Sequence, residues 1–415
     1  MTDAPPRTAR KAALVFIFFT VLIDILAFGV IIPVLPHLVQ QMVGGSISTA
    51  AWWVGLFGLA FSAIQFGASP LQGALSDRFG RRPVILLSCL GLGLDFVLMA
   101  LAPTLAWLFL GRVISAFTSA SITTANAYIA DVTGPEGRAK AYGIIGAAFG
   151  VGFVAGPLLG GVLGDIDLRL PFWAAAGLAL LNFCYGLFVL PESLPPEKRS
   201  PRLDWSHANP LGSIRLLRGY PQVFGLAAVM LLANLAHYVY PSVMVLHAEY
   251  RYQWGPSQVA YVLAMVGVLS IIVNALVVGR LVKAVGERRA LLIGLGFGVA
   301  GFLVYAVADV GWVFLLGLPI SALWAVAGPA TQALVTRQVD AREQGRVQGA
   351  LTSLVSLAGI AGPMLYAGSF GWFVRDDAPL QLPGVPFAIA ALLLALAWWM
   401  AWRHAGRPGT SRRAG

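Results

Sequence analysis

Three ionisable residues of this chain lie inside apolar stretches, where little water is expected. Asp24 lies within LIDILAFGVIIPVLP, residues 22–36, and Asp95 and Arg112 lie in two later stretches. A charge at the centre of a bilayer costs about 2.5 to 3.5 kcal/mol on insertion scales, so such residues usually face a cavity or a partner. A carboxylate held between desolvation and a nearby guanidinium can gain and lose a proton, which proton coupling requires. A structural carboxylate capped by hydroxyl groups is the alternative for Asp24.

Arg112 and Asp95 are expected to lie at a similar depth. Arg112 is about eight residues, or ~12 Å, from the outer end of its stretch, and Asp95 is about seven residues from the same face. A guanidinium at that depth requires a carboxylate or backbone carbonyl groups. A static buried ion pair is the alternative to a functional one.

The composition indicates that nearly the whole chain is membrane helix. Of its 415 residues, 58% are hydrophobic and 11% are charged, whereas about a quarter are charged in a soluble domain. An apolar run of roughly 20 residues spans a bilayer as a helix. Twelve such runs are found, at residues 12–36, 52–73, 84–102, 105–129, 139–163, 171–190, 220–246, 257–281, 289–308, 311–335, 347–369 and 384–402. We therefore predict an all-α membrane protein with twelve transmembrane helices.

The net charge of +10 indicates membrane orientation and argues against a nucleic-acid partner. If both termini are cytoplasmic, 24 of the 28 Lys and Arg residues face the cytoplasm, while Arg169, Arg251 and Arg375 fall outside. This asymmetry follows the positive-inside rule. It predicts a multi-pass protein of the plasma (inner) membrane with both termini cytoplasmic.

The chain is predicted to contain two related halves. Residues 191–219 are Pro-rich and charged, which predicts a cytoplasmic linker between residues 1–190 and 220–415. One constant offset of 206 residues places Gly80, Gly111 and Pro157 on Gly286, Gly317 and Pro363. Repeats of this kind are typical of secondary transporters, whose substrate site lies between the repeats. The sequence thus predicts two pseudo-symmetric six-helix halves.

Residues 73–84, GALSDRFGRRPV, predict a short cytoplasmic turn crowded with charge. A carboxylate beside several guanidinium groups can form a latch that breaks when helices move. Gly73 is expected to let its helix pack closely against a neighbour, Gly80 to permit the turn, and Asp131 to reach the same turn. A solvated loop that serves only orientation is the alternative. The predicted latch residues are Gly73, Asp77, Arg78, Gly80, Arg81, Arg82 and Asp131.

Residues 143–161, GIIGAAFGVGFVAGPLLGG, follow the spacing G-x8-G-x3-G-P-x2-G-G. Glycines at intervals of four form a groove for a facing helix, and a proline bends the helix that contains it. Ordinary tight packing is the alternative to a transport role. The residues of this motif are Gly143, Gly152, Gly156, Pro157, Gly160 and Gly161.

The charged turn and the glycine motif together resemble the major facilitator superfamily, in the version found in drug/proton antiporters. SDRFGRRPV is especially similar to the tetracycline/proton antiporters. The resemblance implies the major facilitator fold. The match of the glycine motif implies that the protein is an exporter. It also implies that Arg112 takes part in proton transfer, and that Asp24 and Asp95 match coupling carboxylates of the first and third helices.

The second half departs from that family. The resembled antiporters have a His in helix 8 and an Asp in helix 9, where this chain has Ser270 and Gly298. His237 is the ionisable candidate inside helices 7 to 12, although a structural, hydrogen-bonded histidine is the alternative. The residues predicted to line the substrate cavity are Asn126, Asn234, His237, Asn274 and Gln332.

The predicted function is proton-coupled efflux of a hydrophobic or amphipathic drug by alternating access, with tetracycline as the leading substrate. Export of another drug or metabolite is the first alternative, a proton-coupled uptake symporter is the second, and a non-transporting receptor is the third. The chain has no nucleotide-binding loop, which argues against ATP-driven export. We expect no enzymatic activity, and no cofactor or metal, since the proton gradient supplies the energy. The expected partners are the drug, protons and the lipid bilayer, and the expected state is a monomer.

Overall fold

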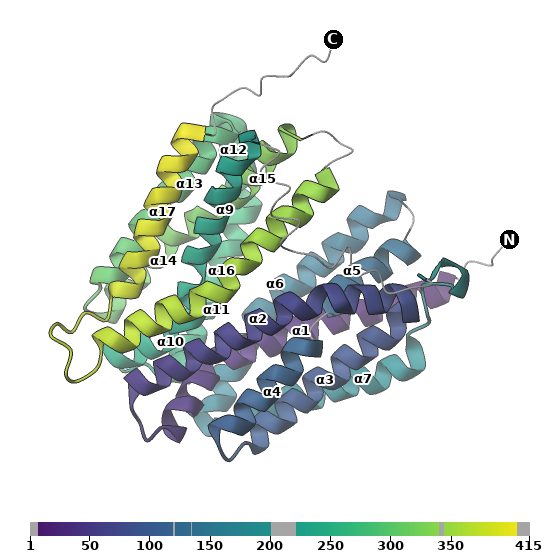
Figure 1. Cartoon of the computed structure of the whole chain (residues 1–415), viewed down its shortest axis with the longest axis horizontal. Helices are drawn as coiled ribbons and strands as arrows, with labels where there is room; N and C mark the ends of the chain where they lie inside the picture. The colour runs from purple at the N-terminus through teal and green to yellow at the C-terminus, as the bar shows by residue number, and fades with distance from the viewer. Residues whose placement is uncertain (1–6, 119–120, 134, 201–220, 340–343, 405–415) are drawn as a thin grey trace, which may run out of the picture. The chain divides into compact units, whose positions relative to one another are not determined.

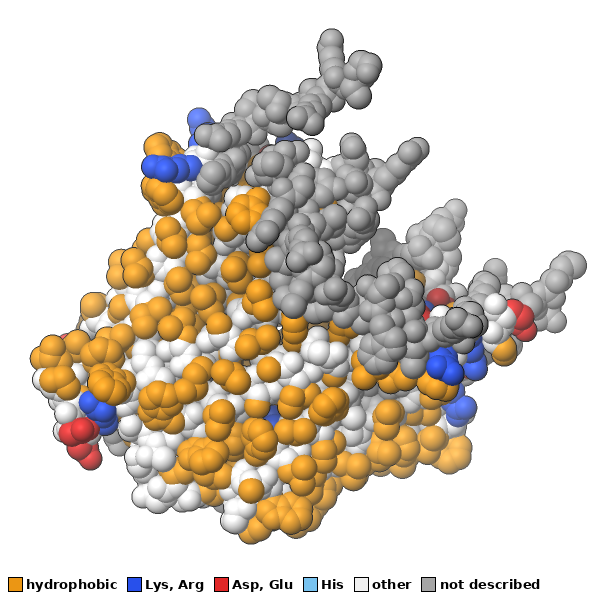
Figure 2. Space-filling view, viewed as in Figure 1, with side chains coloured by type: hydrophobic (Ala, Val, Ile, Leu, Met, Phe, Trp, Pro, Cys, Tyr) orange, Lys and Arg blue, Asp and Glu red, His pale blue; other side chains and the backbone are white. Residues whose placement is uncertain are grey.

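The computed structural model describes residues 7–118, 121–133, 135–200, 221–339 and 344–404. Every regular element in these ranges is helical, and eleven helical segments are long and apolar enough to cross a membrane. Figure 2 shows hydrophobic side chains spread over the described helices, with most of the visible charged side chains near helix ends. These observations confirm the predicted all-α membrane class.

The chain forms two compact units (Figure 1). The first consists of Met1–Gly45, Ala60–Ala208 and Trp254–Ala264, and the second of Ser46–Leu59, Asn209–Gln253 and Met265–Gly415. Each unit therefore includes a short segment from the other half of the sequence. The predicted division into 1–190, 191–219 and 220–415 stays a prediction, because residues 201–220 of the predicted linker lie outside the described ranges.

In the first unit, helices α1 and α2 run beyond the predicted apolar stretches, and each is followed by a glycine with positive φ. Gly44 and Gly45, with φ of 78° and 90°, follow α1, and Gly80, with φ of 104°, separates α2 from α3. The predicted run 105–129 corresponds to α4 and α5, on either side of residues outside the described ranges. The helices are α1 (Arg7–Met42), most of α2 (Ile47–Phe79), α3 (Arg81–Leu101), α4 (Leu105–Thr118), α5 (Ser121–Val132), α6 (Pro135–Ile166), α7 (Leu170–Val189), the 3-10 turn η1 (Pro196–Lys198) and the start of α11 (Pro256–Ile272).

The second unit contains broken helices that hydropathy did not predict. Its elements are the start of α2 and then α9 (Pro221–His237), α10 (Val239–Tyr252), the end of α11 (Pro256–Ile272), the π-helix η3 (Val273–Val278), α12 (Gly279–Val285), α13 (Glu287–Val307), α14 (Gly311–Ala322), the 3-10 turn η4 (Leu323–Val326), α15 (Ala327–Arg337), α16 (Gln344–Phe373) and α17 (Val385–His404). Elements η3 and η4 pack against each other. Irregular backbone at membrane depth is tolerated where protein buries it or where it lines a cavity, and π-helical turns often mark functional sites.

Each unit has its own apolar core. In the first, Phe16 of α1, Ile85 of α3 and Tyr128 of α5 belong to one buried cluster. In the second, the ring of Tyr305 on α13 lies 4.4 Å from that of Phe314 on α14 and 5.6 Å from that of Phe387 on α17. These cores fix the helices that carry the polar residues considered below.

Helix α6 packs closely along α1 through its glycines. A Cβ added at Gly156 would lie 2.5 Å from the carbonyl oxygen of Leu26, and one at Gly160 would lie 2.6 Å from that of Val30. Gly152 likewise faces α1. The predicted groove is confirmed, and the facing helix is α1, which carries Asp24.

The remaining residues of the motif have other surroundings. A Cβ at Gly161 would lie 2.7 Å from the carbonyl oxygen of Pro256, at the start of α11. Pro157 is buried, and its Cδ would lie 2.6 Å from a Cβ at Gly29 of α1. Gly143 lies in α6, but its surroundings are not among those that the structure describes.

The close contact of α6 with α1 predicts that one substitution in α6 lowers the stability of the protein and that another leaves it unchanged. Gly156→Val is expected to destabilise the protein by about 1 to 3 kcal/mol or more, because the added atoms meet backbone and not a movable side chain. Gly146→Val is the matched control, since an added Cβ there has no neighbour within 4 Å. The thermal unfolding midpoints of the purified variants check this, and equal midpoints would show that the helices separate freely.

Candidate functional site

A buried ion pair joins α3 and α4 in the first unit. Arg112 Nη1 lies 3.2 Å from Asp95 Oδ2, and the exposed fractions of the two side chains are 10% and 0%. The guanidinium also lies over the ring of Phe61 in α2, 4.4 Å from its centroid. The predicted common depth of the two residues is thus confirmed, while their role in proton transfer stays a prediction.

The backbone of α4 makes room for the Asp95 carboxylate. A Cβ at Gly111 would lie 2.7 Å from Asp95 Oδ1, so a larger residue there would push the acid away. Ser115, one turn further along α4, also interacts with this carboxylate. Among the described residues, Oδ1 itself has no hydrogen-bond partner. One oxygen therefore holds the guanidinium while the other can accept a proton.

Asp24 lies half-buried on α1, beside a polar cluster that the sequence analysis missed. Asn182 Nδ2 of α7 donates hydrogen bonds to Thr20 Oγ1 at 3.0 Å and to Cys89 Sγ at 3.5 Å. Asp24 interacts electrostatically with Cys89. Asn182 was detectable as a lone amide within an otherwise apolar run. Asp24 therefore lies next to uncharged hydrogen-bonding groups of α3 and α7.

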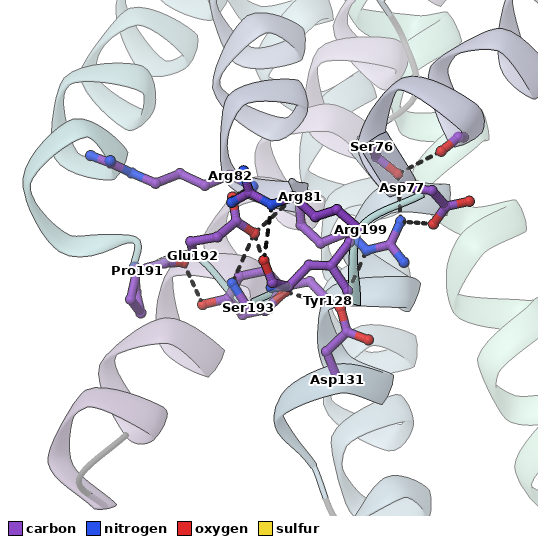
Figure 3. Close-up of polar contacts among 12 residues, drawn as sticks. Ser76, Asp77, Arg81, Arg82, Tyr128, Asp131, Pro191, Glu192, Ser193 and Arg199 are labelled. Atoms are coloured by element: carbon purple, nitrogen blue, oxygen red, sulfur yellow. Dashed lines mark hydrogen bonds and ion pairs between the residues drawn. The ribbon is translucent and has the colours of Figure 1, made fainter. Parts of the chain in front are cut away.

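Arg81 lies at the centre of a second charged site, at one end of the first unit (Figure 3). Its Nη1 lies 2.5 Å from Asp77 Oδ1 and its Nε lies 3.2 Å from Asp131 Oδ2. Nη1 also donates to Ser76 Oγ at 2.6 Å. The structure thus confirms the predicted contacts of Arg81 with Asp77 and Asp131, which join the ends of α2, α3 and α5.

Glu192 occupies the N-terminus of α3, which the sequence analysis did not foresee (Figure 3). Its Oε1 accepts the backbone N–H of Arg81 at 2.8 Å, and its Oε2 accepts that of Arg82 at 3.3 Å. Oε1 also accepts the N–H groups of Ser193 at 2.9 Å and Leu194 at 3.1 Å. An anion at a helix N-terminus is favoured by the helix dipole. Glu192 therefore fixes the segment after α7 to the start of α3.

The two glycines of the charged turn behave differently. Gly80 adopts φ of 104°, as predicted for the turn, and a Cβ there would collide with the Glu192 carboxylate. For Gly73 no described atom lies within 4 Å of an added Cβ, and its expected packing against a neighbouring helix stays a prediction. The backbone of Gly73 does make a contact within α2, since its carbonyl oxygen accepts a hydrogen bond from Ser76 Oγ at 2.9 Å.

Two predicted latch arginines lie outside the ion network. Arg78 lies over the ring of Phe79, 5.2 Å from its centroid. Arg82 Nη2 donates to the carbonyl oxygen of Leu187 at 2.7 Å, near the C-terminus of α7, where the helix dipole favours a cation. The two nearby aspartates are already occupied by Arg81.

The predicted cavity residues of α9 lie beside an aromatic group. The ring of His237 is 5.8 Å from that of Tyr240 and 5.9 Å from that of Trp324 in η4, and its side chain is exposed. Asn234 Nδ2 donates to the carbonyl oxygen of Met230 at 2.8 Å. Trp324 was missed, although a tryptophan in the middle of an apolar run, away from both interfaces, was a usable signal.

The other cavity candidates lie on separate elements. Asn274 lies in η3, is exposed, and donates through Nδ2 to the carbonyl oxygen of Ser270 at 2.9 Å. Gln332 is exposed on α15, which packs against α9. Asn126 lies in α5 with its side chain outside the described set. Asn234, His237, Asn274 and Gln332 belong to the second unit, and Asp24, Asp95 and Arg112 to the first.

Residue 298 of α13, a glycine, is closely surrounded by side chains of the second unit. A Cβ there would lie 2.6 Å from Leu394 Cδ1 and 3.0 Å from the ring of Trp324, so no carboxylate fits without repacking. In the described part of the chain, no group of three or more His, Cys, Asp or Glu residues could hold a metal ion. The expected absence of a cofactor stays a prediction.

Sequence comparisons agree with this architecture. The family model of the Major Facilitator Superfamily matches residues 17–363. The class C tetracycline resistance protein of Escherichia coli is 40% identical over 356 residues, which cover 85% of this chain and 88% of that protein. The class G tetracycline resistance protein of Vibrio anguillarum is 37% identical over 372 residues, with coverage of 87% and 92%.

Solved structures show the same fold. The human organic anion transporter MFSD10 (TETRAN) is 25% identical, with a TM-score of 0.68 and coverage of 95% of this chain and 100% of that chain. The nucleoside transporter NupG is 12% identical, with a TM-score of 0.76 and coverage of 94% and 99%. The predicted major facilitator fold is thereby confirmed.

The buried pair predicts unequal effects of removing its two partners. Asp95→Asn leaves a guanidinium that cannot lose its charge, and is expected to destabilise by about 3 to 5 kcal/mol. Arg112→Gln should cost less, because an unpaired carboxyl can take up a proton, and the double variant should recover part of the loss. Unfolding midpoints of the four proteins measure the coupling.

The exposed pair Arg251–Asp309 is the matched control, because its side chains are 34% and 77% exposed. The same cycle there is expected to give a coupling of about 0.2 to 1 kcal/mol. Additive effects at Asp95 and Arg112 would show that the two groups do not depend on each other.

The contacts of Glu192 predict protection of the adjoining segment from protease. Glu192→Ala is expected to increase tryptic cleavage after Arg199 about tenfold or more, since hydrogen bonds to a charged group contribute about 1.5 to 3 kcal/mol. Glu197→Ala, an exposed residue of η1, is the control and should leave cleavage unchanged. Equal cleavage in both variants would rule out Glu192 as the anchor of this segment.

Proposed function

The chain belongs to the Major Facilitator Superfamily, and from this premise we propose that it exports tetracycline in exchange for protons. Two tetracycline resistance proteins that are 37% and 40% identical to it over most of its length support the substrate. The buried Asp95–Arg112 pair carries the proposal of proton coupling, because a membrane-buried ionisable pair marks an ion pathway.

In this proposal a proton competes with a guanidinium. Arg112 holds Asp95 through one oxygen, and the other oxygen can accept a proton. Protonation removes the negative charge that holds Arg112, so the buried pair weakens and the helices that carry it can rearrange. Asp24 supplies a second carboxylate on α1, beside the amide and hydroxyl groups of the Asn182 cluster.

The second unit supplies an uncharged surface for the drug. The rings of His237, Tyr240 and Trp324 lie together, and the broken elements η3 and η4 place Asn274 and Trp324 on packed segments. Tetracycline is a rigid molecule of fused rings with many oxygen atoms. Flat apolar side chains with a few oriented hydrogen-bonding groups suit such a ligand.

The Arg81 network is proposed to act as the conformational latch. Asp77 and Asp131 come from different helices and both reach Arg81, so any movement of these helix ends must break a charge-assisted contact. The positive-inside distribution supports a cytoplasmic position for this site and for both termini. We further propose a monomer in the plasma membrane, without a cofactor.

Export of other amphipathic drugs is a second candidate function. It is favoured by the tight packing around Gly298, which leaves this part of the second unit without a fixed charge. A site without fixed charges is expected to select its ligands less strictly than a charged one. Drug susceptibility of cells that express the chain, over a panel that includes tetracyclines, distinguishes the two candidates.

The coupling role of Asp24 can be tested in everted membrane vesicles. Addition of tetracycline to energised vesicles is expected to release protons from the lumen with the wild-type protein, and Asp24→Asn is expected to abolish this release while the protein remains inserted. Asp376→Asn, an exposed carboxylate in the loop after α16, is the control and should behave as wild type. Undiminished drug-induced release from the Asp24→Asn protein would exclude Asp24 as a coupling site.

A further inference from the structure

A pocket opens at one end of the second unit, where α12, α13, α15 and α17 meet. Its volume is about 420 Å³. Its walls combine charged and apolar groups, and include Val285, Glu287, Arg288, Arg289, Leu334 and Trp402. None of these residues belongs to the proposed coupling site, the aromatic group of α9 or the Arg81 network.

The pocket carries an excess of positive charge. The carboxylate of Glu287, its one acidic group, lies 2.6 Å from Arg337 Nη2 and is therefore neutralised from outside the pocket. Arg288 Nη2 donates to the carbonyl oxygen of Trp402 at 2.8 Å, which fixes this guanidinium at the pocket wall. Among the described residues, neither Arg288 nor Arg289 has a carboxylate partner. In the part of the chain that the structure describes, two guanidinium groups thus remain available to an anion.

The turn at Gly286, beside the pocket, has a counterpart at Gly80 in the first unit, where protein groups pair with the charges. Gly286 and Gly80 correspond in the repeat, and both have positive φ, of 80° and 104°. Beside Gly80, the arginine after the turn contacts two aspartates, and Glu192 accepts the adjacent backbone N–H groups. Among the described residues, the arginines after Gly286 form no ion pair with a carboxylate, and the adjacent Glu287 pairs with Arg337 instead.

The apolar wall of the pocket belongs to a membrane interface. Trp402 is 53% exposed, and Trp399, one turn earlier on α17, is 42% exposed. The guanidinium of Arg403 lies over the ring of Trp399, 4.0 Å from its centroid. Exposed tryptophans at the end of a spanning helix mark the level of lipid headgroups. The pocket therefore lies where a lipid can present its phosphate to the arginines and its glycerol and acyl chains to the apolar wall.

We propose that this pocket binds the phosphodiester headgroup of an anionic phospholipid, with Arg288 and Arg289 on the phosphate and Leu334 and Trp402 along the glycerol and first acyl carbons. Two guanidinium groups favour a lipid with net negative charge, because the ammonium group of a zwitterionic headgroup would be repelled. The apolar wall favours a lipid over free phosphate. The proposal is independent of the transported drug.

Native mass spectrometry of the purified protein in detergent tests this proposal, with phosphatidylglycerol and phosphatidylcholine as probes. Arg288→Gln/Arg289→Gln is expected to weaken retention of one phosphatidylglycerol roughly tenfold or more, on a scale of about 1 kcal/mol per basic residue. Phosphatidylcholine retention should not change. Leu334→Glu, which keeps both arginines and adds an acid to the pocket wall, should weaken phosphatidylglycerol retention similarly.

Arg280→Gln/Lys283→Gln is the matched control, since it removes two exposed charges of α12 that do not line the pocket. The proposal predicts retention close to that of the wild type for this control, because neither side chain lines the pocket. Equal weakening in both double variants would show a non-specific charge effect and overturn the proposal. Displacement of the lipid by inorganic phosphate would also overturn it, because the pocket would then be a site for free anions.

Discussion

The backbone of α1 lies directly against that of α6 over the stretch that carries Asp24, and the surroundings of this carboxylate depend on that contact. Gly156 faces the carbonyl oxygen of Leu26, and Gly29 faces Pro157, so glycines on both helices let the two backbones approach closely. Helix α1 is thus held on one side by backbone. Its polar residues Thr20 and Asp24 can then interact with Asn182 and Cys89 of α7 and α3.

The two units differ in how they use charge. In the first unit, Asp95, Arg112, Asp77, Arg81 and Asp131 form pairs that join different helices, so each pair is sensitive to helix movement. In the second unit, the candidate cavity residues are amides, a histidine and aromatic rings, placed next to a π-helix and a 3-10 turn. This contrast is the basis for proposing proton coupling through the first unit and drug contact through the second.

Much of this organisation could be predicted from the sequence, because charges in apolar runs are rare and must find partners. The depth of Arg112 pointed to Asp95, and the crowding of the turn pointed to Arg81 with Asp77 and Asp131. Glu192 could not be found in this way, since its partners are backbone N–H groups, which every residue has. The breaks at η3 and η4 were missed because hydropathy records apolar character and not the register of backbone hydrogen bonds.

The glycines also show that a sequence pattern predicts packing only where several positions share one neighbour. A repeated spacing predicted the groove on α6 correctly, because several positions had to face one helix together. A single glycine carries less information, and Gly73 has no close neighbour among the described residues although its position in the motif suggested one. Packing against a neighbour depends on that neighbour's position, which the local sequence does not contain.

The proposed proton coupling requires that Asp24, like Asp95, changes its protonation when the drug binds. Infrared difference spectroscopy of the purified protein, recorded with and without tetracycline at fixed pH, follows the band of the protonated carboxyl group directly. The account predicts a drug-dependent change of this band in the wild type and in His237→Ala, and loss of the Asp24 contribution in Asp24→Asn. A difference spectrum that Asp24→Asn leaves unchanged but His237→Ala abolishes would contradict the account.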